Sequence, residues 1–338
     1  MPCNVIVGGF FGDEGKGKIT AYLSLKDNPL IAVRGGVGAN AGHTFTHNDQ
    51  IFKVRMLPSA LLNRNTRLLI GAGVLVSPTI LLSEIEKYNT NDRTFIDNQC
   101  GIIEDKHVKS DLASDHLRVG LGTTGTGTGP ANADRAIRTL KLAKEIPKLK
   151  KFIADVSSII GDALDGNKFV LVEGTQGTYL SLYHGTYPYV TSKDVTASGI
   201  CSDIGLGPKK IDEVIVVFKS FVTRVGEGPL ENEISPSEAS KRGWTEYGSV
   251  TGRERRSSSF NFELARRAVR LNSATQIGLT KLDILYPKSA GIKEFGKLPK
   301  EAQDFIKKIE DNVGIKVTLI GTGANMADIV DRRHEDQI

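Results

Sequence analysis

The chain has 338 residues, 39% of them hydrophobic and 25% charged, which is usual for a globular protein. Its apolar runs all fall short of the roughly 18 residues of a membrane-spanning helix, so a helical membrane protein is excluded. The formal net charge of +5 is mild and dispersed, so it favours small anionic ligands, and a role in binding nucleic acid ranks well behind.

Short runs rich in valine and isoleucine recur, and several end in glycine. We expect strands at Asn4 to Gly8, Leu30 to Arg34, Arg67 to Gly71, Lys168 to Gly174, Glu213 to Phe218, Gln276 to Leu279 and Lys316 to Gly321. Helical patterns occur at Lys16 to Lys26, Pro78 to Tyr88, Lys141 to Leu164, Phe260 to Leu271 and Pro299 to Asn312. This alternation predicts an α/β fold with a largely parallel central sheet flanked by helices. Ligands should bind at the loops that follow the strands.

The first expected strand leads into the loop Gly12-Asp13-Glu14-Gly15-Lys16-Gly17-Lys18 and then into a helix. Glycines let backbone N–H groups approach an anion, the helix N-terminus adds its dipole, and Lys16 neutralises charge. Gly17 stands where Ser or Thr usually ligates Mg2+, so Asp13 is the expected metal ligand. The loop predicts a P-loop-like site, and a charged glycine turn is the alternative.

A second glycine loop, Arg34 to Thr44, follows the next expected strand and contains His43. A histidine among residues that allow close backbone approach can donate a hydrogen bond to a transferring phosphoryl group. An isolated histidine is more often structural. The pairing with the first loop favours the catalytic interpretation.

Thr280-Lys281-Leu282-Asp283 follows another expected strand. An aspartate there can accept hydrogen bonds from both N1–H and the exocyclic amine of guanine, while the Lys281 stem covers the purine face. This pattern favours GTP over ATP. The segment Gly321-Thr322-Gly323 is placed to close over the same base.

Two further segments are polar and loop-like. The tightest basic group is Arg253-Glu254-Arg255-Arg256, which suits a small anion; its alternative interpretation is a solvated surface patch. Gly226 to Trp244 contains proline and is predicted to form a peripheral subdomain.

We expect residues 1–338 to form one elaborated domain. Cys3, Cys100 and Cys201 lack metal-ligand spacing, so we expect them to be reduced. The N-terminus enters an apolar run without the basic segment of a secretory signal, so the expected compartment is the cytoplasm.

The phosphate loop, Asn40 to Thr44, His184 to Ser192 and Thr280 to Asp283 occur in this order. Together with Gly122 to Gly125, Glu173 to Thr178, Thr223 to Gly226 and Thr251 to Arg253, they resemble the adenylosuccinate synthetase family nearly from end to end. The resemblance implies a ligase that joins L-aspartate to IMP, using GTP as co-substrate and one Mg2+ per subunit. The products are adenylosuccinate, GDP and phosphate, formed through 6-phosphoryl-IMP on the way from IMP to AMP.

The resemblance also implies the site residues. Asp13 would be the general base and His43 the general acid, and Lys16 and Gln176 would also be catalytic. The Asp13 carboxylate and the Gly42 carbonyl would bind the metal. GTP would be bound by Gly12, Glu14, Gly15, Lys16, Gly17, Lys18, Gly42, His43, Thr44, Arg255, Lys281, Leu282, Asp283, Gly321, Thr322 and Gly323. IMP would be bound by Asp13, Asn40, Ala41, Thr124, Gln176, Thr191, Arg253 and Arg138, the last reaching across a homodimer. L-Aspartate would be bound by the loop Ser249, Val250, Thr251, Gly252, Arg253, Glu254 and Arg255.

The chain departs from the family pattern at four positions. Gly36 stands where many members have glutamine, Thr126 and Glu254 where many have arginine, and Val250 where many have threonine. The chain is also shorter than most members of this family between Leu140 and Lys168 and around Gly291. A GTP-binding switch or assembly protein is the rival interpretation, since it would share the phosphate loop and Asp283 but would not need His43, Gln176 or an arginine loop.

Overall fold

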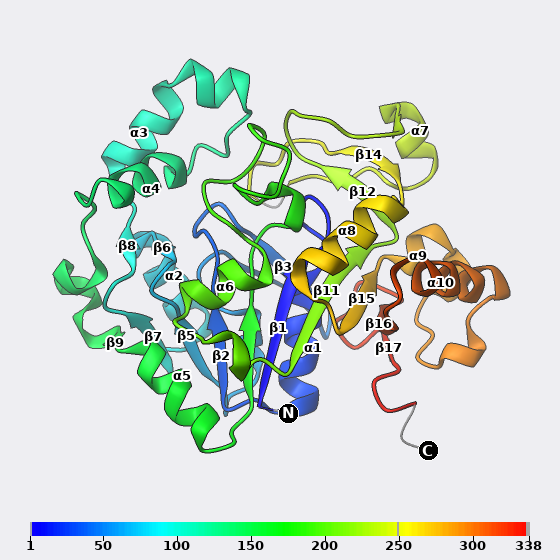
Figure 1. Ribbon diagram of the computed structural model, residues 1–338, viewed down its shortest axis with the longest axis horizontal. Coiled ribbons are helices and arrows are strands. Elements are labelled where there is room, and N and C mark those ends of the chain that lie inside the picture. Colours follow the sequence, from blue (N-terminus) through cyan, green and yellow to red (C-terminus); the bar gives the residue numbers. More distant parts are fainter. Residues whose placement is uncertain (1, 249, 336–338) are drawn as a thin grey trace.

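The computed structural model describes residues 2–248 and 250–335, and its centre is a large twisted sheet (Figure 1). In spatial order the strands are β17 (Ile329–Asp331), β16 (Val317–Gly321), β15 (Gln276–Thr280), β11 (Glu213–Lys219), β1 (Cys3–Gly8), β10 (Val170–Glu173), β2 (Ile31–Arg34), β5 (Arg67–Ile70), β7 (Thr94–Asp97) and β9 (Ile153–Ala154). Neighbouring strands pair in parallel, except that β17 is antiparallel to β16. The predicted fold class is confirmed.

Helices cover both faces of the sheet (Figure 1). The helices packed on the sheet are α1 (Lys16–Asp27), α2 (Pro78–Tyr88), α5 (Val156–Asp165), α6 (Ala197–Asp203), α8 (Phe262–Asn272) and α10 (Lys300–Val313). Successive residues of β1 point to opposite layers, since Ile6 packs with Ile19 of α1 whereas Val5 and Val7 belong to the cluster that contains α5, α6, α8 and α10. Burial on both faces explains why these strands are apolar throughout.

Smaller elements surround this core. They are the hairpin β3 (His43–His47) and β4 (Gln50–Val54), the pair β6 (Leu75–Val76) and β8 (Gly101–Ile102), and the helices α3 (Asp105–Ala113), α4 (Thr128–Ala136) and α9 (Leu282–Leu285). Short turns of 3-10 or π-helix also occur along the chain. These turns are η1 (Ser59–Leu62), η2 (His116–Gly120), η3 (Ala143–Glu145), η4 (Pro147–Phe152), η5 (Thr178–Leu180), η6 (Pro208–Lys210), η7 (Pro287–Ser289) and η8 (Phe295–Lys297).

The polar excursion from Gly226 to Trp244 forms a peripheral unit, as expected. It contributes β13 (Glu233–Ile234) and α7 (Pro236–Lys241) beside β12 (Phe221–Arg224) and β14 (Arg256–Ser259), which make a three-stranded antiparallel sheet. The rings of Phe221 and Trp244 stack with centroids 4.8 Å apart. This packing fixes the start of the arginine-bearing segment that returns to the centre of the molecule.

The prediction of one long helix from Lys141 to Leu164 is wrong. The segment contains the turns η3 and η4, then β9, and only afterwards α5. Pro147 has no N–H to donate and restricts the residue before it, so an α-helix cannot pass through this position without a break. Asp155 accepts a hydrogen bond from the Ser158 N–H at 2.9 Å and so starts α5 late.

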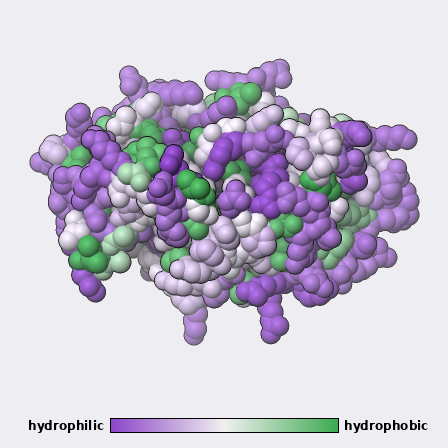
Figure 2. All heavy atoms as spheres, turned by 90° about the horizontal axis from the view of Figure 1, so that it is seen from above, coloured by the Kyte–Doolittle hydropathy of each residue, from purple (hydrophilic) through white to green (hydrophobic). Residues whose placement is uncertain are grey.

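The surface seen in Figure 2 is mainly polar, and the three cysteines of the chain form no disulfide within the described residues. The face in Figure 2 is mostly hydrophilic, with hydrophobic residues in separate small groups. Within residues 2–248 and 250–335, every helix is too short or too polar to cross a membrane. Cys3, Cys100 and Cys201 are buried and free.

Candidate active site

A cavity of about 1040 Å³ opens at the carboxyl ends of the central strands. Its walls include the loops after β1, β2, β10, β12, β15 and β16, the segment between α3 and α4, and the segment that precedes β14. The predicted site residues that line it are Gly12, Asp13, Gly15, Lys16, Gly17, Lys18, Asn40, Ala41, Gly42, His43, Thr44, Thr124, Gln176, Thr191, Val250, Thr251, Gly252, Arg253, Arg255, Lys281, Asp283 and Gly323. Glycine loops far apart in sequence thus meet in one concave space, which is where ligands bind in such sheets.

The first glycine loop has a backbone that ordinary side chains rarely adopt. Gly12, Asp13 and Gly15 have φ values of 88°, 59° and 92°. Among the described residues no side chain caps α1, which begins at Lys16, so its first-turn N–H groups remain for a ligand in the cavity. The loop therefore has the geometry of an anion site.

Glu14 lies inside this loop, outside the cavity lining. Its carboxylate accepts hydrogen bonds from the N–H groups of Phe10 and Gly12 at 2.9 and 2.8 Å, and it pairs with the Lys16 ammonium at 3.1 Å. The ammonium also donates to the backbone carbonyl of Gln176. Glu14 therefore shapes the loop and holds Lys16 at the cavity wall.

His43 belongs to a buried triad with two charged residues, Arg34 and Glu173. β2 and β10 place Arg34 beside Glu173, 3.0 Å apart, and the His43 Nδ1 lies 2.6 Å from a Glu173 oxygen. Burial, followed by the positive charge of Arg34, lowers the pKa of His43 to about 4. Burial alone would raise the pKa of Glu173, but His43 and Arg34 hold it at about 2. The contacts of His43 Nδ1 with Glu173 and Arg34 fix the ring at the cavity wall.

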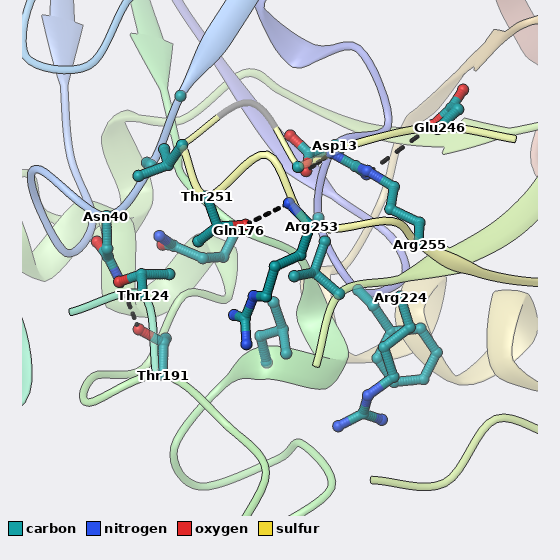
Figure 3. Close-up of a pocket in the computed structure, with 18 of the residues that line it drawn as sticks. Asp13, Asn40, Thr124, Gln176, Thr191, Arg224, Glu246, Thr251, Arg253 and Arg255 are labelled. Carbon is teal, nitrogen blue, oxygen red and sulfur yellow. Dashed lines mark hydrogen bonds and ion pairs between the residues drawn. The ribbon is translucent and has the colours of Figure 1, made fainter. Parts of the chain in front are cut away.

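Asp13 is joined to the arginine segment. Its carboxylate pairs with the guanidinium of Arg255, which is buried and lies close to Glu246 (Figure 3). Lys219 at the end of β11 pairs with Glu246 at 2.6 Å. The pKa of Glu246 lies below its ordinary value because Lys219 and Lys281 outweigh the effect of burial.

Polar groups of the central cavity wall lie between these charges. The Asn40 amide donates to Thr191 at 3.2 Å (Figure 3). Arg253 donates to the carbonyl of Gly122 at 2.7 Å. Both polar atoms of the Gln176 side chain are buried without a hydrogen-bond partner among the described residues. A buried amide of this kind is costly unless a ligand satisfies it.

The loop after β15 forms the far end of the cavity. Lys281 has a φ of 61° and directs the chain into α9, while one oxygen of Asp283 is buried without a hydrogen-bond partner in the described part of the chain. Lys18 donates to the carbonyls of Gly323 and Asp328 at 2.6 and 2.9 Å, and burial lowers its pKa to about 8. Lys18 thus links the phosphate loop to the segment after β16.

Several predicted residues lie elsewhere. Leu282 is in the core, Gly321 ends β16, and the Thr322 hydroxyl donates to the carbonyl of Ile292 at 2.7 Å. Glu254 is outside the cavity lining. Arg138 is exposed after α4, with a φ of 66°, and does not reach the cavity of its own chain. Ser249 lies outside the described residues.

The structure explains one departure from the family pattern. Gly36 has a φ of 101°, and a Cβ built on it would lie 2.0 Å from the Thr175 hydroxyl oxygen. That oxygen accepts a hydrogen bond from the Val37 N–H at 3.1 Å. Thr175 therefore occupies the space that a glutamine at position 36 would need.

The parallel sheet, the glycine loop that leads into a helix and the cavity with opposed acidic and basic groups define a nucleotide-dependent enzyme of the phosphate-loop class. The model of the family described as adenylosuccinate synthetase matches residues 5–145 and 139–289. The chain belongs to the adenylosuccinate synthetase family.

Individual relatives agree over almost the whole length. An adenylosuccinate synthetase of Methanocaldococcus jannaschii is 53% identical over 338 residues, covering 99% of this chain and 98% of the relative. One of Thermococcus onnurineus is 53% identical over 337 residues, covering 98% and 99%. The structure of fully ligated adenylosuccinate synthetase from Plasmodium falciparum superposes with a TM-score of 0.92 at 28% identity, covering 98% and 99% of the two chains. A cyanophage succinoaminodeoxyadenylate synthetase bound to dGMP and dATP gives 0.79 at 25% identity, covering 98% and 95%.

Sequence reasoning missed four charged residues of this site, namely Arg34, Glu173, Lys219 and Glu246. Three of them end apolar strands, Arg34 in β2, Glu173 in β10 and Lys219 in β11. A charge at the last position of a fully buried strand was the signal that would have found those three. Glu246 carries no such signal, because it lies in an irregular segment.

Proposed function

We propose that this protein catalyses the GTP-dependent ligation of L-aspartate to IMP, which yields adenylosuccinate, GDP and phosphate on the route from IMP to AMP. Family membership supports the reaction. The observation that carries its chemistry is that Asp13 and His43, from two separate glycine loops, line one cavity. A switch or assembly protein is not favoured, since it needs neither His43 nor the unpartnered amide of Gln176.

The chemistry follows from a leaving-group problem at C6 of IMP. The C6 oxygen departs only after it has been converted into phosphate, and GTP supplies that group. Asp13 removes the N1 proton, and the O6 anion attacks the γ-phosphate while Lys16 and His43 stabilise the spreading negative charge. The amine of aspartate then displaces phosphate at C6. Gln176 would orient the purine of IMP, which is supported by its buried amide that has no partner among the described residues.

Substrate positions are assigned residue by residue. Asn40, Ala41, Thr124 and Thr191 would bind IMP, and the loop from Val250 to Arg255 would bind aspartate. Arg253 would bind a carboxylate of L-aspartate through two parallel hydrogen bonds from its guanidinium. Lys281 and Asp283 would select guanine, in line with the unpartnered Asp283 oxygen at the end of the cavity.

The residues present suit a magnesium ion. Asp13 offers a carboxylate with 31% of its side chain exposed, and Gly42 lies on the same cavity. The described residues contain no group of three or more His, Cys, Asp or Glu side chains placed to hold a metal. Magnesium in such sites commonly uses one or two protein ligands and completes its shell with phosphate oxygens and water. When bound, the ion would neutralise charge on the phosphates.

The active unit would be a cytoplasmic homodimer. Arg138 would act on the IMP of the partner subunit, which is supported by its exposed position outside the cavity of its own chain. A contribution from a second copy fits the closed symmetry of most homodimers.

One assay separates the two functions. Phosphate release from GTP is measured with and without IMP and L-aspartate, together with the absorbance of the purine product. The proposal predicts both signals only when all three substrates are present. GTP hydrolysis that is independent of IMP and aspartate, without a purine product, would instead identify a switch protein.

A further inference from the structure

Glu246 lies among three cations at the edge of the cavity, and Figure 3 shows it beside one of them, Arg255. One carboxylate oxygen is 2.6 Å from the Lys219 ammonium and 3.9 Å from the Arg255 guanidinium, and the other is 3.5 Å from the Lys281 ammonium. That second oxygen is buried and accepts no hydrogen bond from the described residues. Glu246 is therefore held by charge and retains capacity to accept a further donor.

Arg255 has two carboxylates within reach. One terminal nitrogen of its guanidinium pairs with Asp13, and the other lies 3.9 Å from Glu246. Its Nε is buried without a hydrogen-bond partner among the described residues. The two segments are also tied by the backbone, since the Arg255 N–H donates to the Glu246 carbonyl at 2.9 Å. The Arg255 guanidinium thus lies between the two carboxylates and is nearer to Asp13.

The three cations differ in freedom. The side chain of Lys219 is only 2% exposed, and it also contacts Thr223, so it is a fixed partner. The Lys281 side chain is 47% exposed and follows the strand whose loop is assigned to the guanine. Lys281 is thus the cation that a nucleotide base can draw away from Glu246, because its ammonium makes only a loose pair there.

We propose that Glu246 is a positioning residue that couples recognition of the purine base to release of Asp13. The inference rests on the proposed function. While Lys281 pairs with Glu246, Arg255 remains on Asp13. When Lys281 turns to cover the base, Glu246 loses one cation and accepts Arg255. The Asp13 carboxylate is then free to take the N1 proton of IMP.

The test compares kcat with GTP and with ITP, both saturating. ITP lacks the exocyclic amine from which Asp283 is assigned to accept a hydrogen bond. We therefore expect its base to be held less firmly and to draw Lys281 away from Glu246 less well. In the wild type we expect a lower kcat with ITP than with GTP. Glu246→Gln should lower kcat with GTP on the order of tenfold, because Asp13 stays paired and general-base catalysis is lost. The difference in kcat between the two nucleotides should disappear, while KM continues to favour GTP.

Glu233→Gln is the matched control. Glu233 makes the same kind of carboxylate–arginine pair with the neighbouring Arg256, at 2.9 Å, and it lies outside the cavity. Its loss should change neither kcat nor the ratio between the nucleotides. A purely structural role of Glu246 would lower stability and leave the kcat ratio as in the wild type.

Lys281→Met provides a second route that keeps Glu246 in place. It should raise KM for both nucleotides and bring kcat with ITP up to the value with GTP. A kcat ratio that persists in Glu246→Gln or in Lys281→Met, or equal kcat values in the wild type, would overturn the coupling. Adenylosuccinate formation by the wild type tests the proposed function in the same assay, so an active enzyme with an unaltered ratio contradicts the coupling alone.

Discussion

The Asp13 carboxylate pairs with the guanidinium of Arg255, 242 positions later in the chain. This contact joins the phosphate loop after β1 to the segment before β14 and places the proposed general base against the proposed aspartate loop. While this contact lasts, one oxygen of the Asp13 carboxylate is engaged by Arg255, so the surroundings of Arg255 belong to the chemistry of the site.

Guanine selection is tested by Asp283→Asn. The amide donates where the carboxylate accepts, so kcat/KM with GTP should fall about 10- to 100-fold, the cost of a lost hydrogen bond to a charged group. Xanthosine triphosphate should become the better substrate. Unchanged preference in a competition assay with both nucleotides would remove Asp283 from the site.

The shared active site is tested by mixing two inactive proteins, Arg138→Leu and Asp13→Ala. In a mixed dimer one site contains neither substitution, so mixing should restore up to about a quarter of wild-type activity if subunits exchange at random. Exchange is followed by mass spectrometry of the native dimers. If the subunits exchange but no activity is recovered, Arg138 acts within its own chain and not on the site of the partner subunit.

Gly36→Gln should destabilise the protein. The left-handed backbone and the 2.0 Å approach to Thr175 should cost about 1–3 kcal/mol, measured as a shift in the denaturant midpoint. The double variant Gly36→Gln/Thr175→Ala lacks the side chain that obstructs the glutamine, so it should recover part of the lost unfolding free energy. A double variant no more stable than the single one would show that the Thr175 side chain is not the cause.

Glu173→Gln should destabilise the protein by about 3–5 kcal/mol at neutral pH, because Arg34 would lose its buried partner. The pKa of Glu173 is lowered from 4.5 to about 2. Its ion pairs therefore stabilise the fold fully above pH 4.5, and this contribution is lost as pH falls toward 2. The variant should show a flatter decline in unfolding free energy across that window. An unaltered pH profile would mean that Glu173 does not stabilise the fold through its charge.

Much of the fold was predictable because it is encoded locally. Apolar runs gave the central strands, and the bounds of α2 match the pattern from Pro78 to Tyr88. The helix predicted from Lys141 to Leu164 was wrong because the apolar residues are spaced as in a helix, whereas Pro147 breaks the segment. Sequence placed Asp13, His43 and Lys281 after their strands, but the spatial order β1-β10-β2 that brings Glu173 beside Arg34 depends on long-range pairing. Glu246 was missed for the same reason, since its partners belong to three distant segments. The single-domain organisation stays a prediction.

In the proposed mechanism, O6 of IMP attacks the γ-phosphate before aspartate arrives at C6. Asp13 and His43, on the same cavity, are assigned to that step. Their replacement by asparagine should fall mainly on kcat, because both act in the transition state. Direct attack of aspartate on C6 with separate hydrolysis of GTP would use the same substrates and give the same products, so rates alone do not distinguish the two routes.

An oxygen-18 label at C6 of IMP separates them. If O6 attacks the γ-phosphate first, the label should leave in inorganic phosphate, detected by mass spectrometry, in step with adenylosuccinate formation. Asp13→Asn and His43→Asn should suppress the transfer of label and product formation together. Label recovered in solvent water, with unlabelled phosphate from the wild-type enzyme under full turnover, would contradict the mechanism even if adenylosuccinate were formed.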